Sequence, residues 1–158
     1  MDIVRARQLE HLEIDYAVEM DEFWSFVNNK KNQRWTWYAI EKQTGIIISW
    51  HNGKRTNRDL NILLSQVREI PIKKYFTDHL DFYRTTLRPS EHIPGKDQTQ
   101  QIERKNLNFR THLKRLNRRT ICYSKNEQVH DNVIGMYIER FYYKTGIYVY
   151  NPINPFDT

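Results

Sequence analysis

The sequence of 158 residues contains a single cysteine, Cys122, and only five glycines. One cysteine cannot form an internal disulfide, and it cannot supply the thiolates of a zinc finger. No apolar run approaches the roughly 20 residues that a membrane-spanning helix needs, and the charged amino terminus has no secretory apolar segment. We therefore expect a soluble cytoplasmic protein without a membrane partner, in a reducing compartment.

Acidic residues are outnumbered by basic ones, 19 against 25, which gives a net charge of +6 and a pI near 9.4. From residue 104 to 119 every charged residue is basic: Arg104, Lys105, Arg110, Lys114, Arg115, Arg118 and Arg119. The chain is also 13% aromatic, and aromatic rings can stack on exposed bases. This combination favours a nucleic-acid partner, and a merely solvated basic face is the alternative.

Alternation of apolar and polar residues predicts strands over 18–27, 34–41 and 46–50. Short polar turns separate them, so we expect an antiparallel three-strand meander. The first strand carries Asp21 near its middle. The neighbouring Glu22 falls on the opposite side of that strand, because successive side chains alternate between faces.

Aromatic residues are concentrated in the second predicted strand. Trp35, Trp37 and Tyr38 fit sheet and core positions better than a base-stacking platform, because aromatic side chains are common on half-buried sheet surfaces.

After the meander the apolar period lengthens from two to about three and a half residues. Thr56 is predicted to cap a helix that Pro71 ends. A short strand over 73–77 follows, with Asp78 at its carboxyl end. A brief helix then runs through Tyr83, and a short extended piece covers residues 92 and 93.

A long helix is predicted around Glu103, with an apolar stripe from Ile102 to Leu116. Ser124 and Glu127 form a capping-box pattern at the start of a last helix. The order of elements is an α/β pattern of one domain. We assign residues 1–17 to a lead-in or linker, 18–143 to the domain and 144–158 to a tail.

Three acidic residues fall where this order can bring them to one edge of the sheet: Asp21, Asp78 and Glu103. Three carboxylates repel one another unless cations lie between them, and two divalent ions roughly 4 Å apart are a common device for attack on a phosphodiester. Carboxylate oxygens suit magnesium or manganese. Taken singly, each residue has a commoner role: a solvent-facing strand residue, a helix cap or a helix-surface ion pair.

Four segments in order resemble the catalytic half of transposases of the insertion-sequence-one family: Glu19–Trp24, Tyr75–His79, Gln101–Asn108 and Ser124–Gly135. The spacing is the most specific part of the resemblance. Between Asp78 and Glu103 lie 24 residues (103 − 78 − 1), the second interval of that family's Asp-Asp-Glu signature. Arg110 follows Glu103 by seven residues, where these transposases carry a basic residue.

The resemblance implies an RNase H-like fold, in which helices flank a mixed sheet that contains the meander. It also implies DNA cleavage and strand transfer at insertion-sequence ends. Asp21, Asp78 and Glu103 would hold two Mg²⁺ or Mn²⁺ ions, and Arg110 would hold a phosphate, with the other basic residues of 104–119 on the DNA. His130 and Asp131 are candidates for a pair behind the metals, or equally for a structural role.

The implied partners are double-stranded DNA, at transposon ends and target, and further copies of the chain in the active complex. The resemblance places the protein in a prokaryotic cytoplasm, associated with the nucleoid when bound. It also implies a zinc-finger and helix-turn-helix part, encoded upstream and joined by translational frameshifting, since neither feature precedes Val18. The alternatives are a structure-specific nuclease on the same fold and a non-catalytic DNA-binding fragment.

Overall fold

The computed structural model describes residues 15–140. Most of the predicted lead-in and the whole predicted tail lie outside these residues, so the domain boundaries stay predictions. Within 15–140 no helix is long and apolar enough to cross a membrane.

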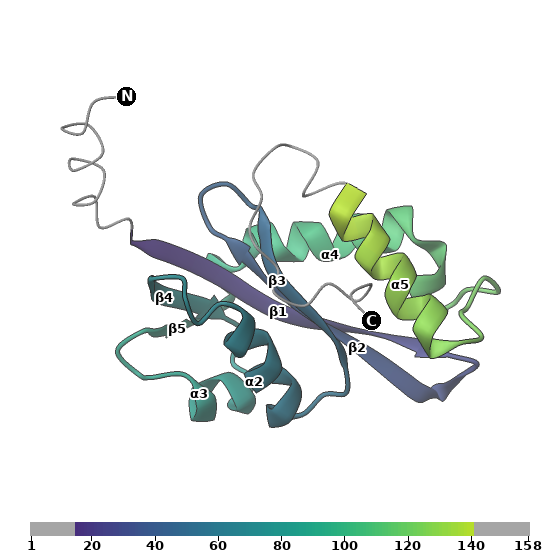
Figure 1. The fold of residues 1–158 in the computed structure, drawn as a ribbon, viewed down its shortest axis with the longest axis horizontal. Coiled ribbons are helices and arrows are strands. Elements are labelled where there is room, and N and C mark those ends of the chain that lie inside the picture. Colours follow the sequence, from purple (N-terminus) through teal and green to yellow (C-terminus); the bar gives the residue numbers. More distant parts are fainter. Residues whose placement is uncertain (1–14, 141–158) are drawn as a thin grey trace.

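A five-stranded mixed sheet forms the centre of the molecule (Figure 1). Its strands are β1 (Tyr16–Val27), β2 (Asn29–Glu41), β3 (Ile47–Gly53), β4 (Ile72–Thr77) and β5 (His92–Pro94). The spatial order is β3-β2-β1-β4-β5, with β1, β2 and β3 antiparallel and with β4 parallel to both β1 and β5. The predicted meander and the α/β class are confirmed, and the arrangement is compatible with an RNase H-like fold.

The turn between β1 and β2 is shorter than predicted. Asn28 has a φ of 65°, and Val27 pairs with Asn29 directly across it. Asparagine tolerates this left-handed conformation, so one residue suffices to reverse the chain. Residues 29–32, predicted as turn because they are polar, therefore belong to β2.

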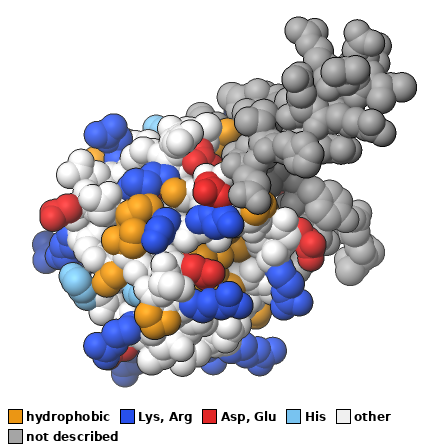
Figure 2. Space-filling view, turned by 90° about the vertical axis from the view of Figure 1, so that its left-hand side faces the viewer, with side chains coloured by type: hydrophobic (Ala, Val, Ile, Leu, Met, Phe, Trp, Pro, Cys, Tyr) orange, Lys and Arg blue, Asp and Glu red, His pale blue; other side chains and the backbone are white. Residues whose placement is uncertain are grey.

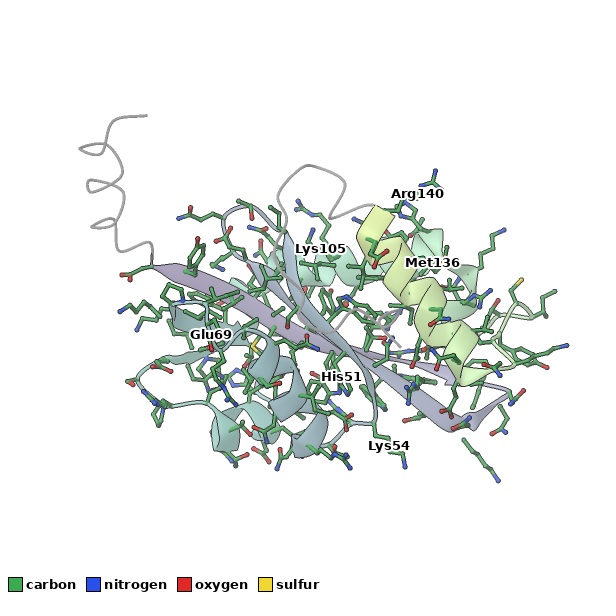
Figure 3. All side chains as sticks on the ribbon, viewed as in Figure 1. His51, Lys54, Glu69, Lys105, Met136 and Arg140 are labelled. Carbon is green, nitrogen blue, oxygen red and sulfur yellow. The ribbon has the colours of Figure 1, made fainter. Side chains whose placement is uncertain are left out.

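Four helices cover the two faces of the sheet (Figure 1). They are α2 (Asn57–Gln66), α3 (Asp81–Thr86), α4 (Gln100–His112) and α5 (Glu127–Ile138). Short 3₁₀ turns at Lys96–Gln98 and Lys114–Leu116 flank α4. One core lies under α2 and α3, around Met20 and Trp37, and the other lies under α4 and α5, around Phe23 and Phe109. Figure 3 shows Lys105 of α4 and Met136 of α5 on this second side.

Two helix boundaries differ from the sequence prediction. The Thr56 hydroxyl caps α2 as predicted, by accepting the Asp59 N–H at 3.3 Å. At α5, however, the Asn126 side chain accepts the Val129 N–H, so the predicted Ser124 capping box is wrong. The helix that carries Glu103 ends at His112, whereas the predicted apolar stripe continued to Leu116.

The start of α4 is fixed by a buried carboxylate on β1. Glu19 is only 1% exposed, and its Oε2 accepts the backbone N–H of Ile102 at 3.0 Å. Its Oε1 accepts a bond from the Lys42 ammonium at 3.1 Å. The first N–H groups of a helix have no partner within the helix, so Glu19 supplies one from the sheet.

We therefore expect Glu19→Ala to lower the free energy of unfolding by about 3 kcal/mol, because it leaves a buried N–H and a lysine without their acceptor. Glu19→Gln keeps an acceptor oxygen and should cost clearly less. Urea unfolding followed by circular dichroism measures both. Equal losses for the two variants would show that the helix N–H does not depend on this acceptor.

Candidate active site

Parallel pairing of β1 with β4 sets Asp21 and Asp78 at the same level of the sheet. The last paired residues are Glu19 and Phe76. Asp21 follows two residues later within β1, and Asp78 follows two residues later, just after β4 ends at Thr77. Asp78 is half-buried, and its Oδ1 accepts the Leu80 N–H at 2.9 Å. The Asp78 charge contributes to a raised pKa of Asp21, as expected for two neighbouring carboxylates.

Asp21 is held by α4 and by its own strand. Its Oδ2 accepts a hydrogen bond from the Asn106 amide at 2.6 Å, and its Oδ1 accepts the Glu22 N–H at 2.9 Å. Burial raises the pKa of Asp21 to about 7, and the nearby Glu22 and Asp78 charges add to the rise that these two bonds oppose. Asp21 forms no ion pair within residues 15–140. Both groups that donate to Asp21 are neutral amides.

Glu22 lies on the opposite face of β1, as the alternation predicted. Its Oε1 accepts a bond from the Arg55 guanidinium at 2.8 Å, and its Oε2 accepts one from the Tyr83 hydroxyl at 2.8 Å. Burial raises the pKa of Glu22, and the bonds from Arg55 and Tyr83 counteract that rise. Unlike Asp21, Glu22 forms an ion pair with a cationic side chain, Arg55.

Glu103 lies in the first turn of α4, and its side chain is exposed. Asn106, whose amide bonds Asp21, follows it by three residues, so the two side chains are neighbours on the helix. Within residues 15–140 no three His, Cys, Asp or Glu side chains are placed to hold a metal ion together. The structure thus sets Asp21 and Asp78 at the same level of adjacent segments, and Glu103 one helical turn from Asn106 on α4.

Arg110 lies on the same helix, one turn beyond Asn106. Its side chain is half-buried, with the guanidinium 6.0 Å from the centre of the Phe23 ring. Burial and the Arg118 charge lower the pKa of Arg110, whereas the Asp21 charge raises it. Its Nε has no hydrogen-bond partner in the part of the chain that the structure describes. Arg110 thus carries an unused donor on the helix whose Asn106 holds Asp21.

The other predicted DNA-binding residues do not share one helix. Arg104 and Lys105 are on α4, Lys114 and Arg115 are in the 3₁₀ turn, and the remaining two follow it: Arg118 and Arg119. Arg104, Lys114, Arg118 and Arg119 are exposed. Figure 2, which views the left-hand side of Figure 1, shows lysine and arginine side chains interspersed with acidic, hydrophobic and other ones. The predicted DNA-binding residues are therefore spread over α4, the 3₁₀ turn and the segment after it, and not along one helical row.

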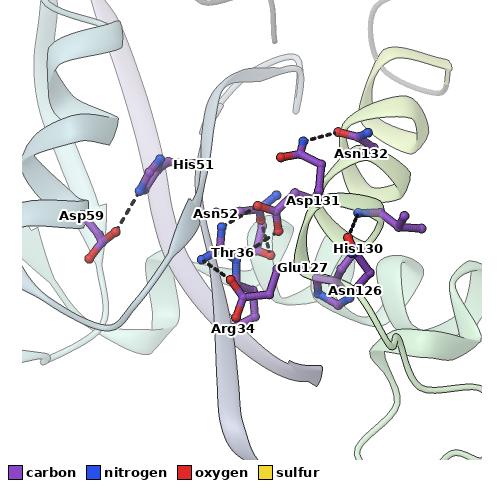
Figure 4. Close-up of polar contacts among 12 residues, drawn as sticks. Arg34, Thr36, His51, Asn52, Asp59, Asn126, Glu127, His130, Asp131 and Asn132 are labelled. Atoms are coloured by element: carbon purple, nitrogen blue, oxygen red, sulfur yellow. Dashed lines mark hydrogen bonds and ion pairs between the residues drawn. The ribbon is translucent and has the colours of Figure 1, made fainter. Parts of the chain in front are cut away.

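His130 and Asp131 hold α5 against the sheet. His130 is fully buried, with its Nε2 2.8 Å from the Ser25 hydroxyl and its Nδ1 2.7 Å from the Ser124 hydroxyl. Burial lowers the pKa of His130 to about 4, so the ring is neutral at pH 7. Asp131 accepts a bond from Arg34 Nε at 3.0 Å (Figure 4). These contacts go to β1, β2 and the loop before α5, and not to Asp21 or Asp78.

Sequence reasoning missed three side chains of the site: Asn106, Arg55 and Tyr83. Asn106 carried a usable signal, because it follows Glu103 by one helical turn. Arg55 and Tyr83 gave none, since only the folding of α3 and the β3–α2 loop onto β1 brings them to Glu22.

The raised pKa of Asp21 predicts a pH-dependent stability. The folded-state value, about 7, lies above the ordinary 3.8, so the folded protein binds the proton more tightly. This stabilising contribution is complete below pH 4 and is lost as the pH rises through 7. Asp21→Asn stays neutral throughout, so it should raise the free energy of unfolding by about 2 kcal/mol at pH 8 and by less at pH 5.

Urea unfolding at both pH values checks this expectation, with Asp97→Asn as the control because Asp97 is exposed. The same change at pH 5 and pH 8 would contradict it.

The sequence profile described as IS1 transposase matches residues 15–144 of this chain. The chain is 40% identical over 122 residues to the insertion element iso-IS1n protein InsB of Shigella dysenteriae, a match that covers 77% of this chain and 93% of that protein. It is 38% identical over 128 residues to the insertion element IS1 protein InsB of Shigella flexneri, a match that covers 81% of this chain and 98% of that protein. An Escherichia coli K12 protein, insertion element IS1 4 protein InsB, is 37% identical over 128 residues, 81% of this chain and 77% of its own length. The chain belongs to the IS1 transposase family.

Proposed function

We propose that this chain is the catalytic part of a DNA transposase, which cleaves DNA and joins it at insertion-sequence ends. The observation that carries the proposal is the placement of two carboxylates, Asp21 in β1 and Asp78 just after β4. The parallel register sets them at the same level, and Asp21 is half-buried with a raised pKa and forms no ion pair in the described part of the chain. Such an arrangement costs stability, which is typical of a functional site.

The donor set fits divalent cations with a preference for oxygen. Asp21 and Asp78 would hold two Mg²⁺ or Mn²⁺ ions, and Glu103 would complete the set. Residues three apart on a helix have Cβ atoms about 5–6 Å apart, so the Glu103 side chain is a neighbour of Asn106. The Asn106 amide in turn donates a hydrogen bond to Asp21. When bound, the ions stabilise the negative charge that develops on the phosphodiester oxygens.

The remaining residues position the reactants. The Asn106 amide fixes Asp21 through its 2.6 Å hydrogen bond. Arg110 has an unused Nε donor one helical turn beyond Asn106, and a guanidinium can bind a phosphate with two parallel bonds. The exposed basic residues around 104–119 would neutralise further phosphates of double-stranded DNA. The upstream DNA-binding part and the oligomeric active complex belong to the same proposal.

The test is Mn²⁺-dependent cleavage and joining of DNA that carries the element's own ends, with and without the product of the upstream frame. Glu103→Gln should lower the joining rate by at least about a hundredfold, since it removes a charge from the metal site. Glu69→Gln is the matched control, because Glu69 is exposed and lies near the end of α2 (Figure 3).

Cleavage that needs Glu103 but yields no joined product would favour a structure-specific nuclease. Salt-sensitive DNA binding without cleavage would favour a non-catalytic binding fragment.

The metal site can also be tested without DNA. Mg²⁺ that binds only the folded protein should raise its free energy of unfolding, by about 2.7 kcal/mol at one hundred times the dissociation constant. Asp21→Asn and Asp78→Asn should both remove most of this gain. Thermal unfolding in Mg²⁺, against KCl at the same ionic strength, measures it. A gain that survives both substitutions would place the metal elsewhere.

A further inference from the structure

Two tryptophans lie side by side where the helices no longer cover the sheet. Trp24 of β1 and Trp35 of β2 are direct partners across the two strands, and both rings are half-exposed. Side chains paired in this way have Cβ atoms about 4.5–5.5 Å apart on one face. Trp37 occupies the next position on this face and is fully buried. The core therefore ends between Trp37 and the Trp24–Trp35 pair.

An arginine lies over each of the two half-buried rings. The Arg55 guanidinium is 4.6 Å from the Trp35 ring centre, and the Arg118 guanidinium is 5.0 Å from the Trp24 ring centre. Arg55 is also bonded to Glu22, whereas Arg118 has no carboxylate partner among residues 15–140. We call Trp24, Trp35, Arg55 and Arg118 the Trp-Arg platform. It combines flat aromatic surface with cationic donors.

The platform lies further along β1 than Asp21 and on the other face of the strand. Trp24 follows Asp21 by three residues, a span of roughly 10 Å, and successive side chains alternate between the two faces. The pairing of β1 with β4 ends at Glu19, so this part of β1 has an edge that β4 does not cover. The Arg118 guanidinium lies over Trp24, and the Arg118 charge also lowers the pKa of Arg110 on α4, so Arg118 acts on both sides of this edge. A DNA strand that passes the edge from Asp21 would span about three stacked nucleotides before it reached the platform.

We propose that the Trp-Arg platform binds an unpaired nucleotide of the DNA end, next to the reacting phosphate. This inference rests on the proposed function. Tryptophan rings and guanidinium planes stack on any base, and a guanidinium also binds the phosphate of the same nucleotide. Bases inside a duplex are already stacked on their neighbours, so only a base that is unpaired or extruded can stack on the platform.

The test compares the affinity of the full chain for two labelled DNAs of the same duplex sequence. One is blunt, and the other carries a three-nucleotide unpaired 3′ extension. We expect the wild-type chain to bind the extended DNA about tenfold more tightly. Trp24→Leu should reduce this preference to about twofold or less, whereas Trp24→Phe, which keeps a ring, should retain most of it.

Three further variants separate stacking from folding. Trp50→Leu is the matched control, because Trp50 packs against the α4–α5 core on the other face and its loss should leave the preference unchanged. Arg118→Gln alters an exposed side chain and should reduce the preference at least threefold, against no change for the equally exposed Arg68→Gln. Circular dichroism confirms that each variant is folded.

Equal wild-type affinity for the two DNAs would overturn the inference, as would an equal loss for both DNAs in Trp24→Leu. The two proposals can fail separately. Glu103-dependent joining together with equal affinities would overturn only the platform. A platform-dependent preference in a chain that joins no DNA would keep the platform and overturn the catalytic proposal.

Discussion

The packing of one face of β1 on α4 is the contact on which the candidate site depends. Three successive residues of that face each contact the helix: Glu19 at the Ile102 N–H, Asp21 at the Asn106 amide, and Phe23 at the Phe109 ring. A buried carboxylate is costly unless it is hydrogen-bonded, so Glu19 and Asp21 favour only those placements of α4 that satisfy both. β1, which carries Asp21, thereby fixes the position of α4, which carries Glu103.

Because side chains alternate between the two faces of β1, its two adjacent carboxylates have different partners. Glu22 faces α3 and is compensated by Arg55 and Tyr83, whereas Asp21 faces α4 and is held by neutral donors. Both carboxylates lose contact with water on folding. Within the described residues Glu22 forms an ion pair with Arg55, whereas Asp21 forms none. Structural acids are normally paired when buried. The contrast within one strand is therefore better evidence for a functional Asp21 than its burial alone.

The sequence was informative wherever a short-range period or a cap determines structure. Alternation over residues 18–27 predicted the strand and the faces of Asp21 and Glu22, and Thr56 marked the start of α2. Prediction from the sequence failed where several residues compete for the same polar group. Ser124 fits a capping box, yet its hydroxyl bonds His130, and Asn126 caps the helix instead. The burial of Glu19 depends on α4 and had no local signature.

The same packing limits how Glu103 can join the other two carboxylates. Ile102 and Phe109 are fully buried, and Glu19 bonds the Ile102 N–H, so α4 cannot rotate to turn Glu103 inward without exposing apolar surface and breaking that bond. Each buried side chain of this size contributes about 1.5–3 kcal/mol, more than one exposed glutamate would recover without a bound cation. If the proposed site forms, the approach of Glu103 would therefore come from its own side-chain torsions, with α4 held in place.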